Sequence, residues 1–157
     1  MKLDKKERGE LARKNFTDGY NCSQAVALAF ADVVPLDKST LLRMTSSFGG
    51  GMGRLREVCG AVSVMFLITG LVSGYDTPET GDVKLNHYAH IQELAKKFEE
   101  RKKSIVCREL LGLSEQRQDP KPEERTPEYY HSRPCPDIVA LAAEILAEDL
   151  SENVSDT

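Results

Sequence analysis

Apolar residues recur at helical spacing along most of the chain, with polar residues between them. Positions three and four residues apart share one face of an α-helix, so each such run predicts an amphipathic helix. No run shows the sustained alternation that is typical of β-strands. The pattern therefore predicts an all-α fold, a single compact bundle of about five to seven helices. The expected helices cover residues 4–17, 21–33, 37–47, 54–73, 82–103, 108–111 and 136–150.

The residues between these runs predict the helix ends and the loops. Asn21 can cap the second helix, and Gln24 three residues later fits the pattern of a capping box. Residues 114–134 are polar and contain four prolines, so we expect one long irregular loop over the surface. Residues 1–150 are expected to form one helical domain and residues 151–157 a frayed C-terminal tail.

The stretch from Val58 to Val72 is the most apolar part of the chain. At ~1.5 Å per residue it would span ~22 Å as a helix, less than the ~30 Å hydrocarbon core of a bilayer. We therefore expect a central buried helix and no membrane insertion. No secretory signal follows Met1, because charged residues stand where an apolar segment would be needed. The expected location is cytoplasmic, where cysteines are more often catalytic or metal-binding than paired in structural disulfides.

The composition narrows the classes of partner. The 157-residue chain has a formal net charge of −4. Domains that bind nucleic acids usually carry a basic face, so we expect no nucleic-acid partner. The length is sufficient to bury a core without disulfides, which leaves the cysteines free for chemistry.

The four cysteines, Cys22, Cys59, Cys107 and Cys135, lie far apart in the sequence and form no Cys-x-x-Cys pair. Their spacing alone therefore gives no zinc-ribbon or thioredoxin signal. Cys22 falls in the predicted first turn of a helix, and Cys135 stands just before the start of the last one. Free N–H groups at a helix start lower the pKa of a thiol. Cys59 lies inside the predicted apolar fourth helix, where a cysteine can also be a small buried hydrophobic residue.

Gly49, Gly50, Gly51 and Gly53 form a cluster between two predicted helices. Such a run costs conformational entropy, which indicates a backbone that needs positive φ or a close approach. The N–H groups can donate to sulfur atoms of a bound cofactor or cradle an anion. A plain turn between helices is the alternative.

The residues around the cysteines resemble those of a known family. Cys59-Gly60-Ala61 follows the glycine cluster, with one cysteine upstream and two downstream, in the segments 20–26, 48–53, 107–112 and 135–136. This order is similar to the C_GCAxxG_C_C family of redox-active proteins, defined by a Cys, a Cys-Gly-Ala-x-x-Gly motif and two further Cys. The resemblance covers residues 16–146 and implies a redox role for the four cysteines. Val64 replaces the last glycine of the motif, a change that can narrow the site.

Three kinds of chemistry are open. Thiol–disulfide exchange or electron transfer would use the cysteines with a redox partner protein or a small thiol. A non-enzymatic zinc or iron–sulfur site would use the same four thiolates as ligands. Inert packing in a helical module that binds a partner, a homodimer included, is the third. In each case we expect Cys22 and Cys59 to face each other, with Cys107 and Cys135 approaching from the C-terminal half.

Other polar side chains give weaker signals. His87 and His90 share one face of a helix and can ligate a metal, although a surface or packing role is favoured. His131 lies near the last cysteine and can act as a base to a thiol. Arg54 and Arg56 can hold an anion, although a solvated surface position is favoured.

Overall fold

The computed structural model describes residues 1–78, 81–114 and 118–154, which form helices and one isolated β-bridge. The expected all-α class is confirmed. The helices outnumber the five to seven expected, because short helices also form in the glycine cluster and in the polar loop. They are α1 (Lys5–Thr17), α2 (Cys22–Leu28), α3 (Lys38–Thr45), the 3-10 helix η1 (Ser46–Phe48), α4 (Gly49–Met52), α5 (Gly60–Ser73), α6 (Asp82–Lys102), α7 (Cys107–Leu110), α8 (Pro127–Ser132) and α9 (Cys135–Asn153).

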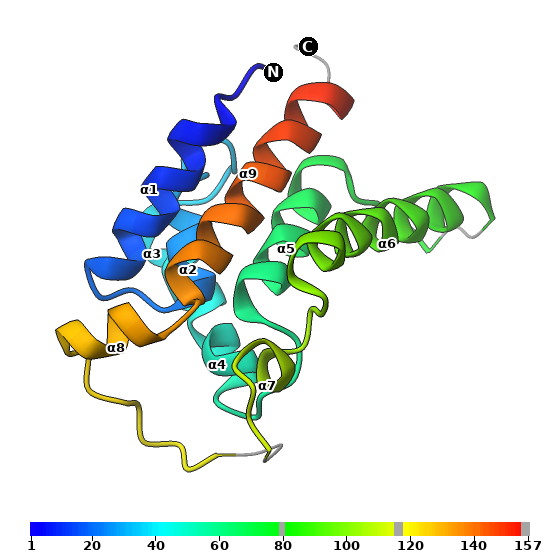
Figure 1. The fold of residues 1–157 in the computed structure, drawn as a ribbon. Coiled ribbons are helices and arrows are strands. Elements are labelled where there is room, and N and C mark those ends of the chain that lie inside the picture. Colours follow the sequence, from blue (N-terminus) through cyan, green and yellow to red (C-terminus); the bar gives the residue numbers. More distant parts are fainter. Residues whose placement is uncertain (79–80, 115–117, 155–157) are drawn as a thin grey trace.

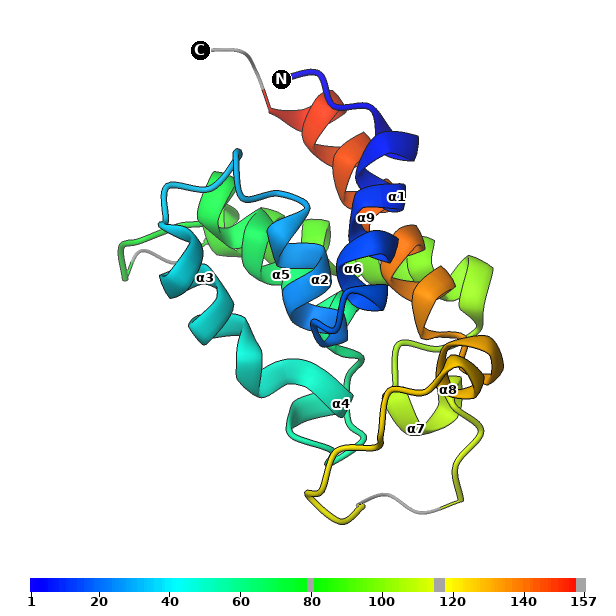
Figure 2. The same cartoon turned by 90° about the vertical axis from the view of Figure 1, so that its left-hand side faces the viewer.

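The helices α1, α2, α5 and α9 pack together at the centre of the bundle (Figure 1). α1 and α9 run side by side in opposite directions, and the Met1 ammonium group donates to the Val154 carbonyl at 3.1 Å. α6 packs on α5 and α9 through its second half, where Leu94 and Phe98 are buried. The short helices α4, α7 and α8 gather at the end of the bundle opposite the termini (Figure 2).

One cluster of buried residues runs through the bundle. α5 and α9 supply much of it, as the apolar runs in these segments predict. No helix in the described ranges combines the length and the apolar character needed to cross a membrane. The largest fully buried side chains are those of Phe16, Phe30, Phe98, Leu41, Met65, Ile68, Leu94, Leu146, Leu150, Val26, Val62 and Val64.

Two predicted helix boundaries are wrong for local reasons. α5 begins at Gly60 and not at residue 54, because Arg54 and Arg56 have positive φ values of 67° and 60°. Left-handed backbone of this kind cannot continue a right-handed helix. α2 ends at Leu28, and the following N–H groups form tighter bonds to carbonyls three residues back. The capping box of α2 is confirmed.

The C-terminal half also differs from the prediction. The expected irregular loop over residues 114–134 contains α8, whose Thr126 cap accepts a hydrogen bond from the N–H of Tyr129 at 3.1 Å. A threonine followed by proline is a known signal for a helix start, and it was overlooked. α9 continues to Asn153, beyond the expected end at Leu150. Residues 115–117 and 155–157, part of the expected loop and tail, lie outside the described residues.

A pair of leucines tests the position of the core. Leu146 of α9 is 0% exposed and Leu85 of α6 is 64% exposed. Leu146→Ala should lower the free energy of unfolding by about 2–5 kcal/mol, because it leaves a cavity in the core. Leu85→Ala should change it by less than about 0.5 kcal/mol. Urea denaturation measures both values, and equal losses would contradict the assigned core.

Candidate functional site

All four cysteines line one cavity of about 70 Å³, which we call the thiol cavity. Cys22, Cys107 and Cys135 are the first residues of α2, α7 and α9, and Cys59 directly precedes α5. The fold thus brings together the four residues that the sequence singled out. Cys59 is buried as expected, but it lies before its helix and not inside it.

Two segments that are distant in the sequence hold Cys59 and Cys107 next to each other. The chain before α5 forms an isolated antiparallel β-bridge with the chain before α7. The N–H of Cys59 donates to the Ile105 carbonyl at 2.8 Å, and the N–H of Cys107 donates to the Glu57 carbonyl at 2.6 Å. These bonds fix the backbone of both cysteines, so the positions from which their side chains reach the cavity are fixed as well.

Glycines allow the backbone to approach the sulfur atoms closely. A Cβ added to Gly60 would lie 2.7 Å from the Cys22 Sγ and 2.5 Å from the Phe48 carbonyl oxygen. A Cβ on Gly51, whose φ is +68°, would lie 2.6 Å from the Cys107 Cβ. All three distances are too short for a side-chain Cβ. These two positions must therefore be glycine for Cys22 and Cys107 to occupy their places.

The rest of the predicted glycine site lies beside the same cavity. Gly50 lines it, and its N–H hydrogen-bonds to Cys22. A Cβ on Gly49 would collide with the Asn21 side chain at 2.5 Å, whereas the nearest atom to a Cβ on Gly53 would be the Ser47 carbonyl oxygen at 4.0 Å. The glycine cluster therefore shapes the thiol cavity, and its role in holding a cofactor stays a prediction.

Burial outweighs the helix termini in setting the thiol pKa values. It raises the pKa of Cys22, although the N–H groups of Gly50, Ser23 and Gly60 oppose the shift. Burial also raises the pKa of Cys59 well above its usual value, and that of Cys135 to about 12. The expected lowering at Cys22 and Cys135 is wrong, because a buried thiolate loses more hydration than these N–H groups restore.

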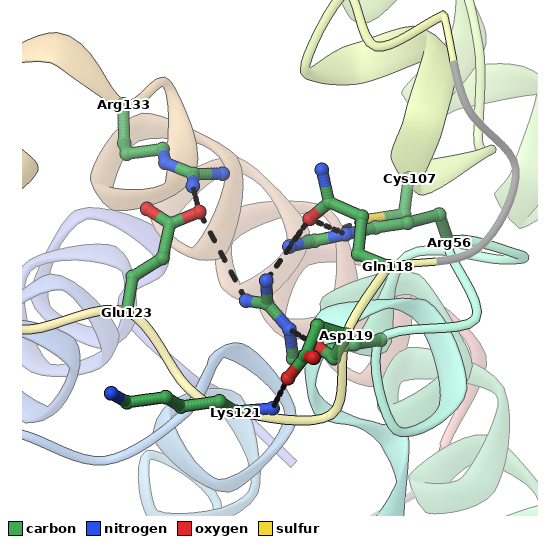
Figure 3. Close-up of polar contacts among 8 residues, drawn as sticks. Arg56, Cys107, Gln118, Asp119, Lys121, Glu123 and Arg133 are labelled. Carbon is green, nitrogen blue, oxygen red and sulfur yellow. Dashed lines mark hydrogen bonds and ion pairs between the residues drawn. The ribbon is translucent and has the colours of Figure 1, made fainter.

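The sulfur of Cys107 accepts a hydrogen bond from an arginine side chain. The Arg56 guanidinium donates through Nη1 to the Cys107 Sγ at 3.4 Å, and through Nη2 and Nε to the Gln118 Oε1 at 2.7 and 3.1 Å (Figure 3). Arg56 is only 4% exposed, so the expected surface position is wrong. In the described part of the chain it forms no ion pair with a carboxylate. Its hydrogen bond to the Cys107 sulfur is a direct contact with a group that can carry a negative charge.

Aromatic rings and two further arginines complete the wall. The Arg125 guanidinium lies 4.4 Å from the Phe16 ring centre and 4.9 Å from that of Tyr129. Arg133 lies 5.1 Å from the Tyr129 ring centre and lowers the pKa of Cys135 against the larger effect of burial. The sequence did not point to Arg125 or Tyr129, because no motif marks them.

The family comparison can now be set against this geometry. The model of a family described as "Putative redox-active protein (C_GCAxxG_C_C)" matches residues 20–149. The chain belongs to this family. No curated protein and no solved structure matches it.

The chain departs from the Cys-Gly-Ala-x-x-Gly motif at one point. Val64 stands where the motif ends in glycine. Val64 is fully buried in the core and is not among the residues that line the thiol cavity. It therefore does not narrow the cavity as the sequence suggested.

The histidines lie outside the thiol cavity of this family member. The His90 Nε2 lies 2.8 Å from the Asp149 Oδ1, which is a packing contact between α6 and α9. His87 packs edge-on against Tyr75, and His131 is exposed on α8. Among the described residues, no three His, Cys, Asp or Glu side chains are grouped so as to hold a metal ion.

Two glycines of α5 test the close approach at Cys22. Gly60→Ala should lower the free energy of unfolding by about 1–3 kcal/mol, because the added methyl group overpacks the contact with Cys22 and Phe48. Gly70→Ala has no heavy atom within 4 Å of the new Cβ, so it should be neutral or stabilise by up to ~1 kcal/mol. Chemical denaturation distinguishes the two, and a harmless Gly60→Ala would contradict the contact.

Proposed function

We propose that this C_GCAxxG_C_C protein carries out thiol–disulfide exchange, with Cys107 as the attacking sulfur and Cys22 as the resolving one. The observation that carries the proposal is the hydrogen bond from the buried Arg56 guanidinium to the Cys107 sulfur. A buried charge without a partner is strongly destabilising. A cation next to a cysteine favours the thiolate, which is the nucleophile in exchange reactions.

Cys22 is the best candidate for the resolving role because negative charge on one of these sulfurs affects the pKa of its neighbours. Negative charge on Cys107 raises the pKa of Cys22, and negative charge on either of these two sulfurs raises the pKa of Cys59 and Cys135. Cys22 is therefore close enough to Cys107 for the charge on one sulfur to affect the other. The same coupling means that the cavity favours one thiolate at a time.

The reaction balances with two cysteines. The Cys107 thiolate attacks one sulfur of a substrate disulfide, forming a mixed disulfide and releasing the first half as a thiolate that takes up a proton. The Cys22 thiol then loses its proton and attacks the Cys107 sulfur, releasing the second half. Two electrons pass from the protein thiols to the substrate, which leaves as two thiols. The reverse sequence would oxidise a dithiol.

The zinc or iron–sulfur alternative has less support. Among the residues that the structure describes, no three His, Cys, Asp or Glu side chains are grouped so as to hold a metal ion. We therefore do not extend the proposal to a metal site.

Brief alkylation of the reduced protein tests the attacking sulfur. A limiting pulse of iodoacetamide near pH 7, followed by peptide mapping, should label Cys107 before the other three cysteines. Arg56→Gln should slow this labelling about tenfold, since a hydrogen bond to a charged group contributes about 1.5–3 kcal/mol. Arg56→Lys keeps the charge and should recover part of the rate.

Trapping of the intermediate tests the resolving sulfur. With one equivalent of a small disulfide, Cys22→Ser should stop at a mixed disulfide on Cys107, and Cys107→Ser should form none. Cys135→Ser is the matched control and should still form the Cys22–Cys107 bond. Equal labelling of all thiols, or a mixed disulfide that forms on Cys135 first, would disprove the assignment.

The pH dependence of Cys135 is a separate prediction. Its pKa is raised from about 9 to about 12, so the thiol stays protonated in the folded protein until strongly alkaline pH. The unfolded chain ionises first as pH rises, so this residue's contribution to stability is present below pH ~9 and is lost towards pH ~12. Labelling of Cys135 should therefore rise at much higher pH in the folded protein than in urea. Superimposable labelling curves would refute the shift.

A further inference from the structure

A second cavity of about 260 Å³ adjoins the thiol cavity, and we call it the outer cavity. Its position follows from the residues that line both cavities. These are Asn21, Gly50, Arg56, Arg125 and Tyr129. The cysteines line only the thiol cavity, so a molecule held in the outer cavity would reach the sulfurs across this shared wall. The volume suits a small molecule and is too small for a folded protein segment.

Positive charge is concentrated around these two cavities. Four arginines line them, Arg54, Arg56, Arg125 and Arg133, and Glu123 is the one carboxylate among the described lining residues. The chain as a whole has a net charge of −4. A cleft of one sign with low-dielectric walls raises the local concentration of ligands of the opposite sign.

Arg125 is held in place without a carboxylate partner in the part of the chain that the structure describes. Its guanidinium stacks against aromatic rings and donates to the Phe16 and Tyr20 carbonyls at 3.3 and 3.4 Å. Backbone carbonyls orient the group but supply no net negative charge. Its positive charge is thus available to a ligand in the cavity that it lines.

Glu123 shows how a carboxylate fits at this place. Its carboxylate forms an ion pair with Arg133 and lies 4.0 Å from Arg54 (Figure 3). The hydrogen bond from Arg133 lowers the pKa of Glu123, so the carboxylate is stabilised as an anion. The Glu123 side chain is still 40% exposed on the polar segment before α8. An entering carboxylate can therefore compete with it for the same arginines.

We propose that the substrate is a small disulfide or thiol that carries a carboxylate, which binds the arginines of the outer cavity and places its sulfur beside Cys107. The inference rests on the proposed exchange function and adds the substrate class. The exchange steps and their electron balance are those given above. The carboxylate takes no part in bond breaking and serves to position the molecule.

Three small disulfides of similar length and different charge test the substrate class. They are 3,3′-dithiodipropionate, bis(2-hydroxyethyl) disulfide and cystamine, which are anionic, neutral and cationic. The rate at which each disulfide oxidises the protein is divided by the rate at which the same disulfide oxidises a simple reference thiol. After this correction, the anionic disulfide should oxidise the protein about tenfold faster than the cationic one at low salt. Added salt should reduce this ratio, because ions screen the attraction.

Three charge variants distinguish a loss of carboxylate binding from a structural change in the site. Arg54→Gln should slow the anionic disulfide severalfold and leave the neutral one within about twofold. Glu123→Gln removes the competing carboxylate and should accelerate the anionic disulfide. Lys96→Gln, on the exposed face of α6 and outside both cavities, removes the same charge as Arg54→Gln and should leave the ratio unchanged.

The outcomes separate the two proposals. If all three disulfides react equally well through Cys107, the substrate class is wrong and the exchange function stands. If Arg54→Gln slows all three disulfides alike, the arginine is structural and the substrate class is overturned. If none of the disulfides oxidises Cys107, the exchange function itself fails.

Discussion

The burial of Arg56 determines how four segments pack together at this end of the bundle. Its backbone is left-handed, its N–H donates to the Gly50 carbonyl at 3.3 Å, and its carbonyl accepts from Arg108. Its guanidinium joins Cys107 to Gln118. One residue thus ties the glycine cluster, the segment before α5, the start of α7 and the polar loop. Removing a cation from water is costly, and that cost is offset only when all these partners are in place.

Placement, and not residue type, distinguishes the four thiols. Three of them are kept protonated by burial, with Cys59 and Cys135 shifted furthest. A protonated thiol is a poor nucleophile and is slow to oxidise. In the proposed exchange, the site would hold its reducing equivalents in a protected form and present them through Cys107, whose sulfur accepts a hydrogen bond from the Arg56 guanidinium. The glycines serve this arrangement, because they let the sulfurs share a cavity of only about 70 Å³.

The sequence correctly predicted the features that depend on residues close together in the chain. Helical periodicity identified the all-α class, and Asn21 with Gln24 marked the start of α2 correctly. The family pattern identified the cysteines, and the fold brings all four to one cavity. The sequence did not predict the start of α5, because the positive φ at Arg56 is enforced by tertiary contacts and not by residue type. Arg125 was missed because its contact with Phe16 of α1 joins residues that are 109 positions apart in the sequence.

The cysteines enter the cavity from segments that are far apart in the chain, and this links folding to redox state. A bond between Cys22 and Cys107 would close a loop of roughly 85 residues, which restricts the unfolded chain by about 4.6 kcal/mol in the chain-entropy model. The two effects are thermodynamically linked. The free energy by which the disulfide would stabilise the folded protein equals the free energy by which folding would disfavour reduction of the disulfide. The midpoint potential of this pair would therefore depend partly on the packing of helices that are remote from either sulfur.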